Sequence, residues 1–134
     1  MAAARKTKKS SIPTPRSRCG ISGTLDMVGD PWSLLIIRDM LFQNKHRYQE
    51  FLASAEGIST NILADRLKKL VERGFAEKIC VDKARGRFEY HPTIKARALA
   101  PMLVEMIRWS NRFMDDTIEP PAAFLEKIRS RFAA

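Results

Sequence analysis

Apolar residues recur every three or four positions along residues 57–74, which predicts a helix of about four turns. The apolar face consists of Ile62, Leu63, Leu67 and Leu70. Ser59 is suited to cap the start of this helix, and Gly74 stands where a left-handed residue commonly ends one. The outward face carries Thr60, Asn61, Ala64, Asp65 and Lys68. Small and hydrogen-bonding side chains on such a face fit the major groove of DNA, although an ordinary amphipathic surface helix shows the same pattern.

The residues before this helix predict three further helices. A weak apolar pattern spans residues 19–29, and residues 31–42 are apolar almost all round, as in a central buried helix. Asp30 is expected to cap the second of these helices, with Pro31 in its first turn. Residues 47–55 predict a short third helix, and a turn at residues 56–57 leads into the helix from Ser59. A short helix, a glycine-containing turn and a second helix make a helix-turn-helix.

After Gly74 the apolar pattern changes to alternation, which predicts a β-hairpin. Residues 75–82 form its first strand, residues 83–86 the turn and residues 87–91 the return strand. Lys83, Arg85 and Arg87 lie at or beside the tip, and arginine is the side chain that a narrow minor groove attracts. A hairpin directly after a recognition-type helix is a wing. The predicted fold class is therefore mainly α with a small β-hairpin, a winged helix-turn-helix.

Two C-terminal helices are expected at residues 93 to about 115 and at residues 122–132, the first capped by Thr93 and kinked or broken at Pro101. Their apolar stripe is wider than one small domain needs to cover, which favours a subunit interface. The expected dimer interface consists of Leu99, Met102, Leu103, Met106, Trp109, Phe113, Phe124, Leu125 and Ile128. The alternative is a monomer with a well-covered core. The chain thus divides into an arm (1–18), a winged helix-turn-helix domain (19–92) and dimerisation helices (93–134).

The chain of 134 residues has a formal net charge of +9, which favours a polyanionic partner, most often nucleic acid. Residues 1–18 contribute +6 of this charge, because they contain six Lys or Arg residues and no acid. This arm is expected to be disordered and either to follow DNA phosphates or to act only as a solubilising tail. No apolar run is long enough to span a membrane, and two cysteines are too few for a disulfide framework. A cytoplasmic, nucleoid-associated protein is expected.

The sequence lacks the common catalytic and metal-binding patterns. His46 and His91 are its only histidines, and they belong to different predicted elements. It contains no Cys-x-x-Cys, no His-Glu-x-x-His and no glycine-rich phosphate loop. We therefore expect neither an enzyme nor a bound cofactor.

The ordered set of residues resembles the HxlR family of bacterial winged helix-turn-helix transcriptional regulators. The resemblance covers about residues 19–110 and is carried by Cys19, Leu25-Asp26, Val28-Gly29, Trp32, Leu35-Ile36-Ile37-Arg38-Asp39, Leu41, Arg47-Tyr48, Glu50-Phe51, Gly57-Ile58-Ser59, Leu63, Arg66-Leu67, Leu70, Glu72, Gly74, Glu89-Tyr90 and Thr93. The chain departs from the family pattern at Asp30-Pro31, where a Gly-Lys pair is usual, and after Tyr90, where Leu-Thr and then Gly are usual. The basic arm has no counterpart in that pattern.

The resemblance implies a homodimer on two operator half-sites, with each helix from Ser59 in a major groove and each wing on the backbone or in the minor groove. It also places Cys19 where some relatives sense oxidants or electrophiles. Positive charge from Arg16 and Arg18, together with a position at the start of a helix, would lower the pKa of this thiol. No other cysteine is close in sequence, and Cys80 lies on the predicted hairpin. An intersubunit Cys19 bridge and a mixed disulfide with a small thiol are the two possible products, and an unreactive cysteine is the alternative.

These features predict a sequence-specific transcriptional regulator that binds double-stranded promoter DNA as a homodimer. Phosphate contacts are expected from Arg47, Ser59 and the wing, and base contacts from the outward helix face. Arg66 is expected on the core edge, paired with Glu50 or Asp39. The alternatives are a winged-helix module that binds a protein and an architectural protein that binds DNA without sequence preference. The sequence defines no pocket for a small-molecule effector.

Overall fold

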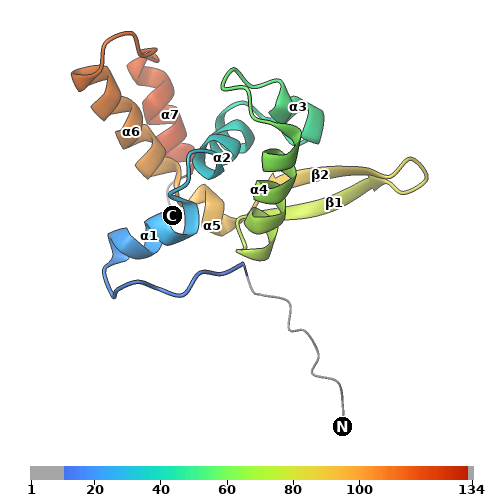
Figure 1. Cartoon of the computed structure of the whole chain (residues 1–134). Helices are drawn as coiled ribbons and strands as arrows, with labels where there is room; N and C mark the ends of the chain where they lie inside the picture. The colour runs from blue at the N-terminus through green and yellow to red at the C-terminus, as the bar shows by residue number, and fades with distance from the viewer. Residues whose placement is uncertain (1–10, 133–134) are drawn as a thin grey trace.

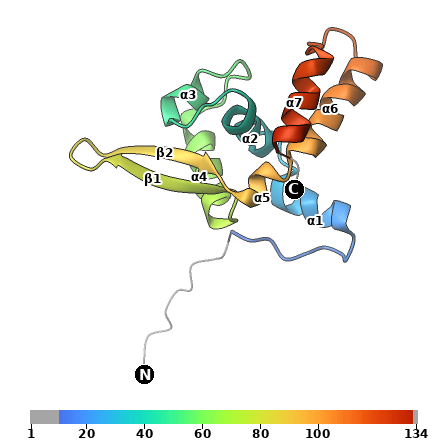
Figure 2. The same ribbon diagram turned by 180° about the vertical axis from the view of Figure 1, so that it is seen from behind.

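The computed structural model describes residues 11–132 as seven helices and one two-stranded sheet (Figure 1). The elements are α1 (Gly20–Val28), α2 (Ser33–Phe42), α3 (Tyr48–Leu52), α4 (Thr60–Glu72), β1 (Ala76–Asp82), β2 (Arg87–Pro92), α5 (Ile94–Arg97), α6 (Ala100–Phe113) and α7 (Ala122–Arg131). The β-hairpin projects from one side of the body and the α6–α7 pair from the other, with α2 between them (Figures 1 and 2). The predicted fold class is confirmed.

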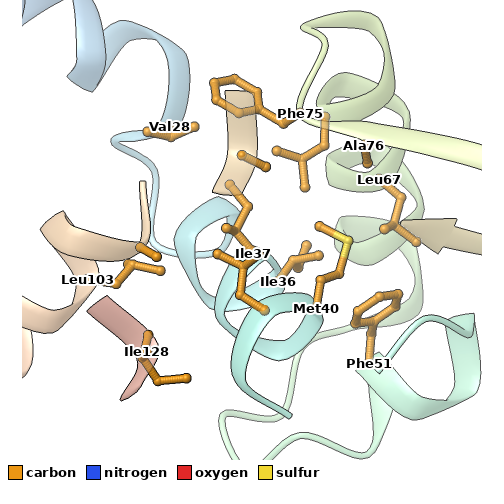
Figure 3. Close-up of a cluster of buried hydrophobic side chains, with 14 of the residues drawn as sticks. Val28, Ile36, Ile37, Met40, Phe51, Leu67, Phe75, Ala76, Leu103 and Ile128 are labelled. Atoms are coloured by element: carbon orange, nitrogen blue, oxygen red, sulfur yellow. The ribbon is translucent and has the colours of Figure 1, made fainter. Parts of the chain in front are cut away.

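Helix α2 is the central buried helix, as its apolar sequence predicts. Ile36, Ile37 and Met40 are each at most 3% exposed. Around them gather Phe51 from α3, Leu67 from α4 and several residues of the C-terminal helices (Figure 3). One apolar core therefore joins the helix-turn-helix to the C-terminal helices.

The start of α2 differs from the prediction by two residues. The helix begins at Ser33 rather than at Pro31, and residues 31–32 form a turn. Asp30 nevertheless caps this end, because its Oδ2 accepts hydrogen bonds from the backbone amides of Trp32 (3.0 Å) and Ser33 (3.1 Å). The carboxylate satisfies amides that the helix itself leaves unpaired.

Helix α4 has the predicted bounds and caps, whereas α3 is shorter than predicted. The Ser59 hydroxyl accepts from the amide of Ile62 at 3.2 Å, and Gly74 ends the helix with φ of +82°. Gly57 makes the preceding turn with φ of +71°, a conformation that favours glycine. Helix α3 ends at Leu52 rather than at Ala55.

The wing is an antiparallel hairpin whose register shifts by one residue between Cys80 and Asp82. Its base is fixed to the helix-turn-helix, because the amide of Tyr90 donates to the carbonyl of His46 at 2.7 Å. Ile79, Val81 and Phe88 are all more than 40% exposed. Most of the hairpin therefore extends beyond the core.

The predicted helix from Thr93 to Asp115 is broken into α5 and α6. Thr93 caps α5 by accepting from the amide of Ala96 at 3.3 Å, and α6 starts at Ala100 with Pro101 in its first turn. A proline without an N–H is tolerated there but not in a helix interior, which explains the break. Among residues 11–132, each helix is too short or too polar to cross a lipid bilayer.

Candidate nucleic-acid interface

The outward face of α4 is free of core contacts. All of the side chains predicted to face DNA there are exposed: Ser59, Thr60, Asn61, Ala64, Asp65 and Lys68. The opposite face buries Leu63, Leu67 and Leu70 to 1% exposure or less. This division leaves a surface of small and hydrogen-bonding side chains on the solvent side of α4, the kind of surface that a major groove accommodates.

A hydrogen bond from α3 fixes the start of α4. The hydroxyl of Tyr48 donates to the carbonyl oxygen of Thr60 at 3.0 Å. Phe51, one turn further along α3, is 1% exposed in the core. The two helices of the helix-turn-helix are thus joined by one polar contact and by apolar packing.

Arg66 pairs with Asp30, and not with Glu50 or Asp39 as predicted. Its Nε lies 2.8 Å from Asp30 Oδ2, and its guanidinium also contacts the neighbouring Asp65. Partial burial opposes ionisation of Asp30, but hydrogen bonds from Ser33, Arg66 and two backbone amides lower the pKa of this carboxyl to about 2. The prediction was wrong because Asp30 and Arg66 are far apart in sequence and meet only when α4 packs beside the start of α2.

A second ionic contact, which the sequence analysis missed, holds the turn before α4. Arg38 donates to both carboxylate oxygens of Glu56, at 2.9 and 2.8 Å. It also donates to the buried Asp39, whose other oxygen accepts from the hydroxyl of Ser54 at 2.5 Å. The bidentate contact with Glu56 raises the pKa of Arg38 and lowers that of Glu56. Helix α2 therefore holds both α4 and the turn that precedes it.

Two exposed groups on α4 differ in how far they are already paired. The carboxylate of Asp65 lies 3.1 Å from Lys69 Nζ and contacts Arg66; partial burial opposes the effect of these cations, yet they lower its pKa. Lys68 forms no ion pair with any carboxylate among residues 11–132. Lys68 is therefore available for a phosphate or a guanine, and the charge of Asp65 is partly neutralised.

The wing tip carries exposed cations, as predicted. Lys83, Arg85 and Arg87 are all exposed, and Gly86 makes the turn with φ of +62°. The amide of Arg85 donates to Asp82 Oδ1 at 3.2 Å, whereas its guanidinium is 3.8 Å from the same carboxylate. Asp82 thus shapes the turn and leaves the cationic groups in solvent.

Arg47 lies between the helix-turn-helix and the wing. Its amide donates to Glu50 Oε1 at 3.0 Å at the start of α3, and its Nε is 3.5 Å from Glu89 Oε2 on β2. Glu89 also accepts from His91 Nε2 at 2.9 Å, and this bond is the largest cause of its lowered pKa. With its side chain 57% exposed, Arg47 remains accessible to a phosphate.

Cys19 is an exposed free thiol at the N-terminal end of α1. The backbone amides of Ser22 and Ile21 face its sulfur and lower its pKa. Of the two predicted causes, the helix start is the one that operates, whereas the charge of Arg16 is paired with Asp26. Cys80, the second cysteine, is also exposed and free.

The residues predicted for the dimer interface fall into three groups. Leu103, Leu125 and Ile128 are at most 6% exposed, because α6 and α7 pack on the core of the same chain. Leu99 and Met102 are half-buried. Met106, Trp109, Phe113 and Phe124 are 37–63% exposed. Large apolar side chains outside the predicted set are also exposed on α1, where Ile21 is 74% and Leu25 54% exposed.

The predicted arm is described from residue 11 onward, and the prediction for residues 1–10 lies outside the described chain. The Nε of Arg73, at the end of α4, donates to the carbonyl of Ser11 at 2.8 Å. Its Nη1 donates to the carbonyl of Met27 at 2.7 Å. Arg73 therefore ties the arm and α1 to α4. Over residues 11–132, no group of three or more His, Cys, Asp and Glu side chains is arranged to hold a metal ion.

Comparisons with known proteins agree with this architecture. The model of the HxlR-like helix-turn-helix family matches residues 27–118. The HTH-type transcriptional regulator YvaP of Bacillus subtilis (strain 168) is 31% identical over 91 residues, which are 68% of this chain and 83% of YvaP. The crystal structure of PA1607 is similar with a TM-score of 0.68 and 36% identity, over 78% of this chain and 73% of PA1607. The redox regulator HypR in its oxidised form has a TM-score of 0.64 and 25% identity, over 72% of this chain and 99% of HypR. The chain belongs to the HxlR-like helix-turn-helix family of transcriptional regulators.

Proposed function

We propose that two copies of this chain bind a promoter operator with sequence preference, each inserting α4 into a major groove. The observation that carries the proposal is the outward face of α4, where the side chains of Ser59, Thr60, Asn61, Ala64, Asp65 and Lys68 are exposed and contribute nothing to the core. Asn61 and Thr60 address base edges, Ala64 permits close approach, and Lys68 reaches a guanine or a phosphate. Arg47 and the wing cations contact the backbone on either side.

The proposed dimer forms through the exposed apolar faces of α1 and α6. Ile21 and Leu25 on α1, with Trp109 and Phe113 on α6, are large side chains that one copy leaves in solvent. One recognition helix contacts few base pairs, so a two-fold pair doubles the recognised sequence. The dimer then acts by steric means at the promoter, and a change of a few ångströms between its two recognition helices breaks register with the DNA repeat of about 34 Å.

A second part of the proposal is a redox function for Cys19. The thiol is exposed and its pKa is lowered by helix amides, the two properties that favour attack on an oxidant. The name of HypR describes it as a redox regulator. Two Cys19 thiols from two subunits transfer two electrons and two protons to hydrogen peroxide. The O–O bond breaks, two waters form and a Cys19–Cys19 bond joins the subunits.

Fluorescence anisotropy tests the DNA-binding proposal. A duplex from upstream of the protein's own gene is compared with a scrambled duplex across a salt series. We expect affinity that falls with salt and a preference of about a thousandfold for the specific duplex. Salt-sensitive binding without preference would favour an architectural protein. No binding at low salt would favour a module that binds a protein.

The same titration with peroxide tests Cys19. We expect a change in duplex affinity and a dimer band on non-reducing gels, both absent in Cys19→Ser. Cys80→Ser is the matched control, because Cys80 is also an exposed free thiol. A redox response that persists in Cys19→Ser would exclude this sensor.

A further inference from the structure

An open cavity of about 820 Å³ lies between the end of α2, the return strand of the wing, α5 and the end of α7. Its apolar wall includes Phe42 from α2, Ile94 and Ala98 around α5, and Phe132 after α7. Ile94 is 86% exposed, so its side chain is available to an apolar ligand. The volume is within the range of roughly 300–1,000 Å³ that small-molecule sites occupy.

The charged groups that line the cavity are cationic. Arg97 and Arg131 contribute guanidinium groups, and the lining residues include no aspartate or glutamate. Neither arginine forms an ion pair with a carboxylate of residues 11–132, unlike Arg38, Arg66 and Arg108. The guanidinium of Arg131 instead lies 5.3 Å from the ring centre of Phe132. These arginines are therefore free to bind an anion in the cavity.

The two histidines of the chain form a flat aromatic part of the same wall. His46 and His91 stack with ring centres 4.1 Å apart and an angle of 15°. Oxygens of the protein already occupy their edges: His46 Nδ1 is 3.1 Å from the Tyr90 carbonyl, and His91 Nε2 is 2.9 Å from Glu89. The pair therefore offers contact to a flat molecule rather than free hydrogen-bonding groups.

We propose that this cavity binds a small organic acid with a flat apolar body. Its carboxylate pairs with Arg97 and Arg131, and its body packs on Phe42, Ile94 and Phe132. An inorganic anion satisfies the arginines but leaves the apolar wall in water, and a neutral aromatic molecule leaves the arginines unpaired. Only an anion with an apolar body matches both sets of residues.

Occupation of the cavity would affect DNA binding, a consequence that rests on the proposed function. One wall belongs to the base of the wing at His91, and the opposite wall belongs to α7 at Arg131. A ligand that contacts both walls stabilises one relative position of the wing and the C-terminal helices. It changes duplex affinity by the ratio of its own affinities for the free and DNA-bound forms.

Isothermal titration of the full chain with 1-naphthoate tests the site without DNA. We expect saturable binding, and no comparable binding of 1-naphthalenemethanol or inorganic phosphate. The double variant Arg97→Gln/Arg131→Gln should weaken naphthoate binding by about tenfold or more. Arg112→Gln is the matched control, because Arg112 also lies over a neighbouring phenylalanine, at 5.1 Å, but lines no part of this cavity. Ala98→Trp, which places an indole ring in the cavity where the naphthalene ring would pack, should weaken binding and preserve the thermal midpoint.

The proposal is overturned if naphthoate binds the double variant as well as the wild type, or does not bind at millimolar concentration. It is also overturned if naphthoate affinity falls as protein concentration rises, since a second copy would then cover the cavity. Anisotropy with saturating naphthoate tests the regulatory consequence separately. An unchanged duplex affinity would refute that consequence. If the protein without naphthoate binds no DNA, the proposed function is refuted instead.

Discussion

Replacing Asp30 by asparagine separates the charge of this residue from its capping role. In the native chain, Asp30 accepts from the amides of Trp32 and Ser33 and pairs with Arg66 of α4 at 2.8 Å. Asparagine keeps a side-chain oxygen for the amides but carries no charge for the guanidinium. The substitution therefore weakens the link between α2 and α4 while the helix start stays capped.

The size of the effect follows from the lowered pKa. The pKa of Asp30 falls from an ordinary value of 3.8 to about 2. At about 1.4 kcal/mol per pKa unit, this difference corresponds to at most about 2.5 kcal/mol of folding free energy. Because the Asp30 side chain is 25% exposed, solvent screening reduces the expected loss in Asp30→Asn to about 1–2 kcal/mol.

Urea unfolding at several pH values measures this loss, with protomer concentration held constant. A carboxyl whose folded pKa is lowered stabilises the fold above its unfolded pKa, and the stabilisation is lost as pH falls through the folded pKa. The difference in unfolding free energy between wild type and Asp30→Asn should therefore be constant above about pH 5 and shrink between about pH 4 and 2. Asp82→Asn is the control: Asp82 also accepts from a backbone amide, but its partner Arg85 is 70% exposed and 3.8 Å away, so a change below about 1 kcal/mol is expected. If this difference in unfolding free energy is absent at pH 7, or does not change with pH, the charge of Asp30 does not stabilise the fold.

Four further substitutions test other parts of the structure. Leu67→Ala, at 1% exposure, should lower the free energy of unfolding by about 2–5 kcal/mol in urea. A loss below about 1 kcal/mol would mean that neighbouring side chains relax to fill the space left by Leu67. Asn61→Ala should reduce the preference for the specific duplex by about 1–3 kcal/mol in anisotropy, and equal weakening on all duplexes would contradict its base contact. Arg85→Ala should reduce by about one the slope of log affinity against log salt concentration. An unchanged slope would mean that the wing tip does not contact the DNA backbone. Trp109→Glu should yield monomers by sedimentation, and intact dimers would place the interface elsewhere.

The local parts of the fold could be predicted from the sequence because their signals are local. The bounds of α4 follow from an apolar repeat, a serine cap and a terminal glycine within one short segment. The hairpin follows from alternation and a turn, and the break before α6 follows from Pro101. Each of these features depends on residues a few positions apart, where spacing alone fixes the geometry.

The predictions that failed depend on contacts between residues that are distant in sequence. Arg66 forms its ion pair with Asp30 rather than with Glu50 because α4 packs beside the start of α2. No local sequence pattern predicts that pairing. The division of the apolar stripe between core and surface depends on how α7 folds back on α6, which buries Leu125. The cavity is made from four separate elements, so it has no sequence signature.

Under the proposed function, helix α2 is the element that connects the C-terminal helices to α4. It is bonded to α4 through Asp30 and Arg66 and to the preceding turn through Arg38 and Glu56, and its other side packs against α6. A close-packed core shifts as a unit and does not deform continuously. A change at the C-terminal helices therefore moves α2 and α4 together, and leaves the recognition face itself unaltered. In the proposed dimer, its effect on DNA binding comes from the distance and angle between two such units, whereas a ligand in the cavity of one copy acts on the position of that copy's own wing.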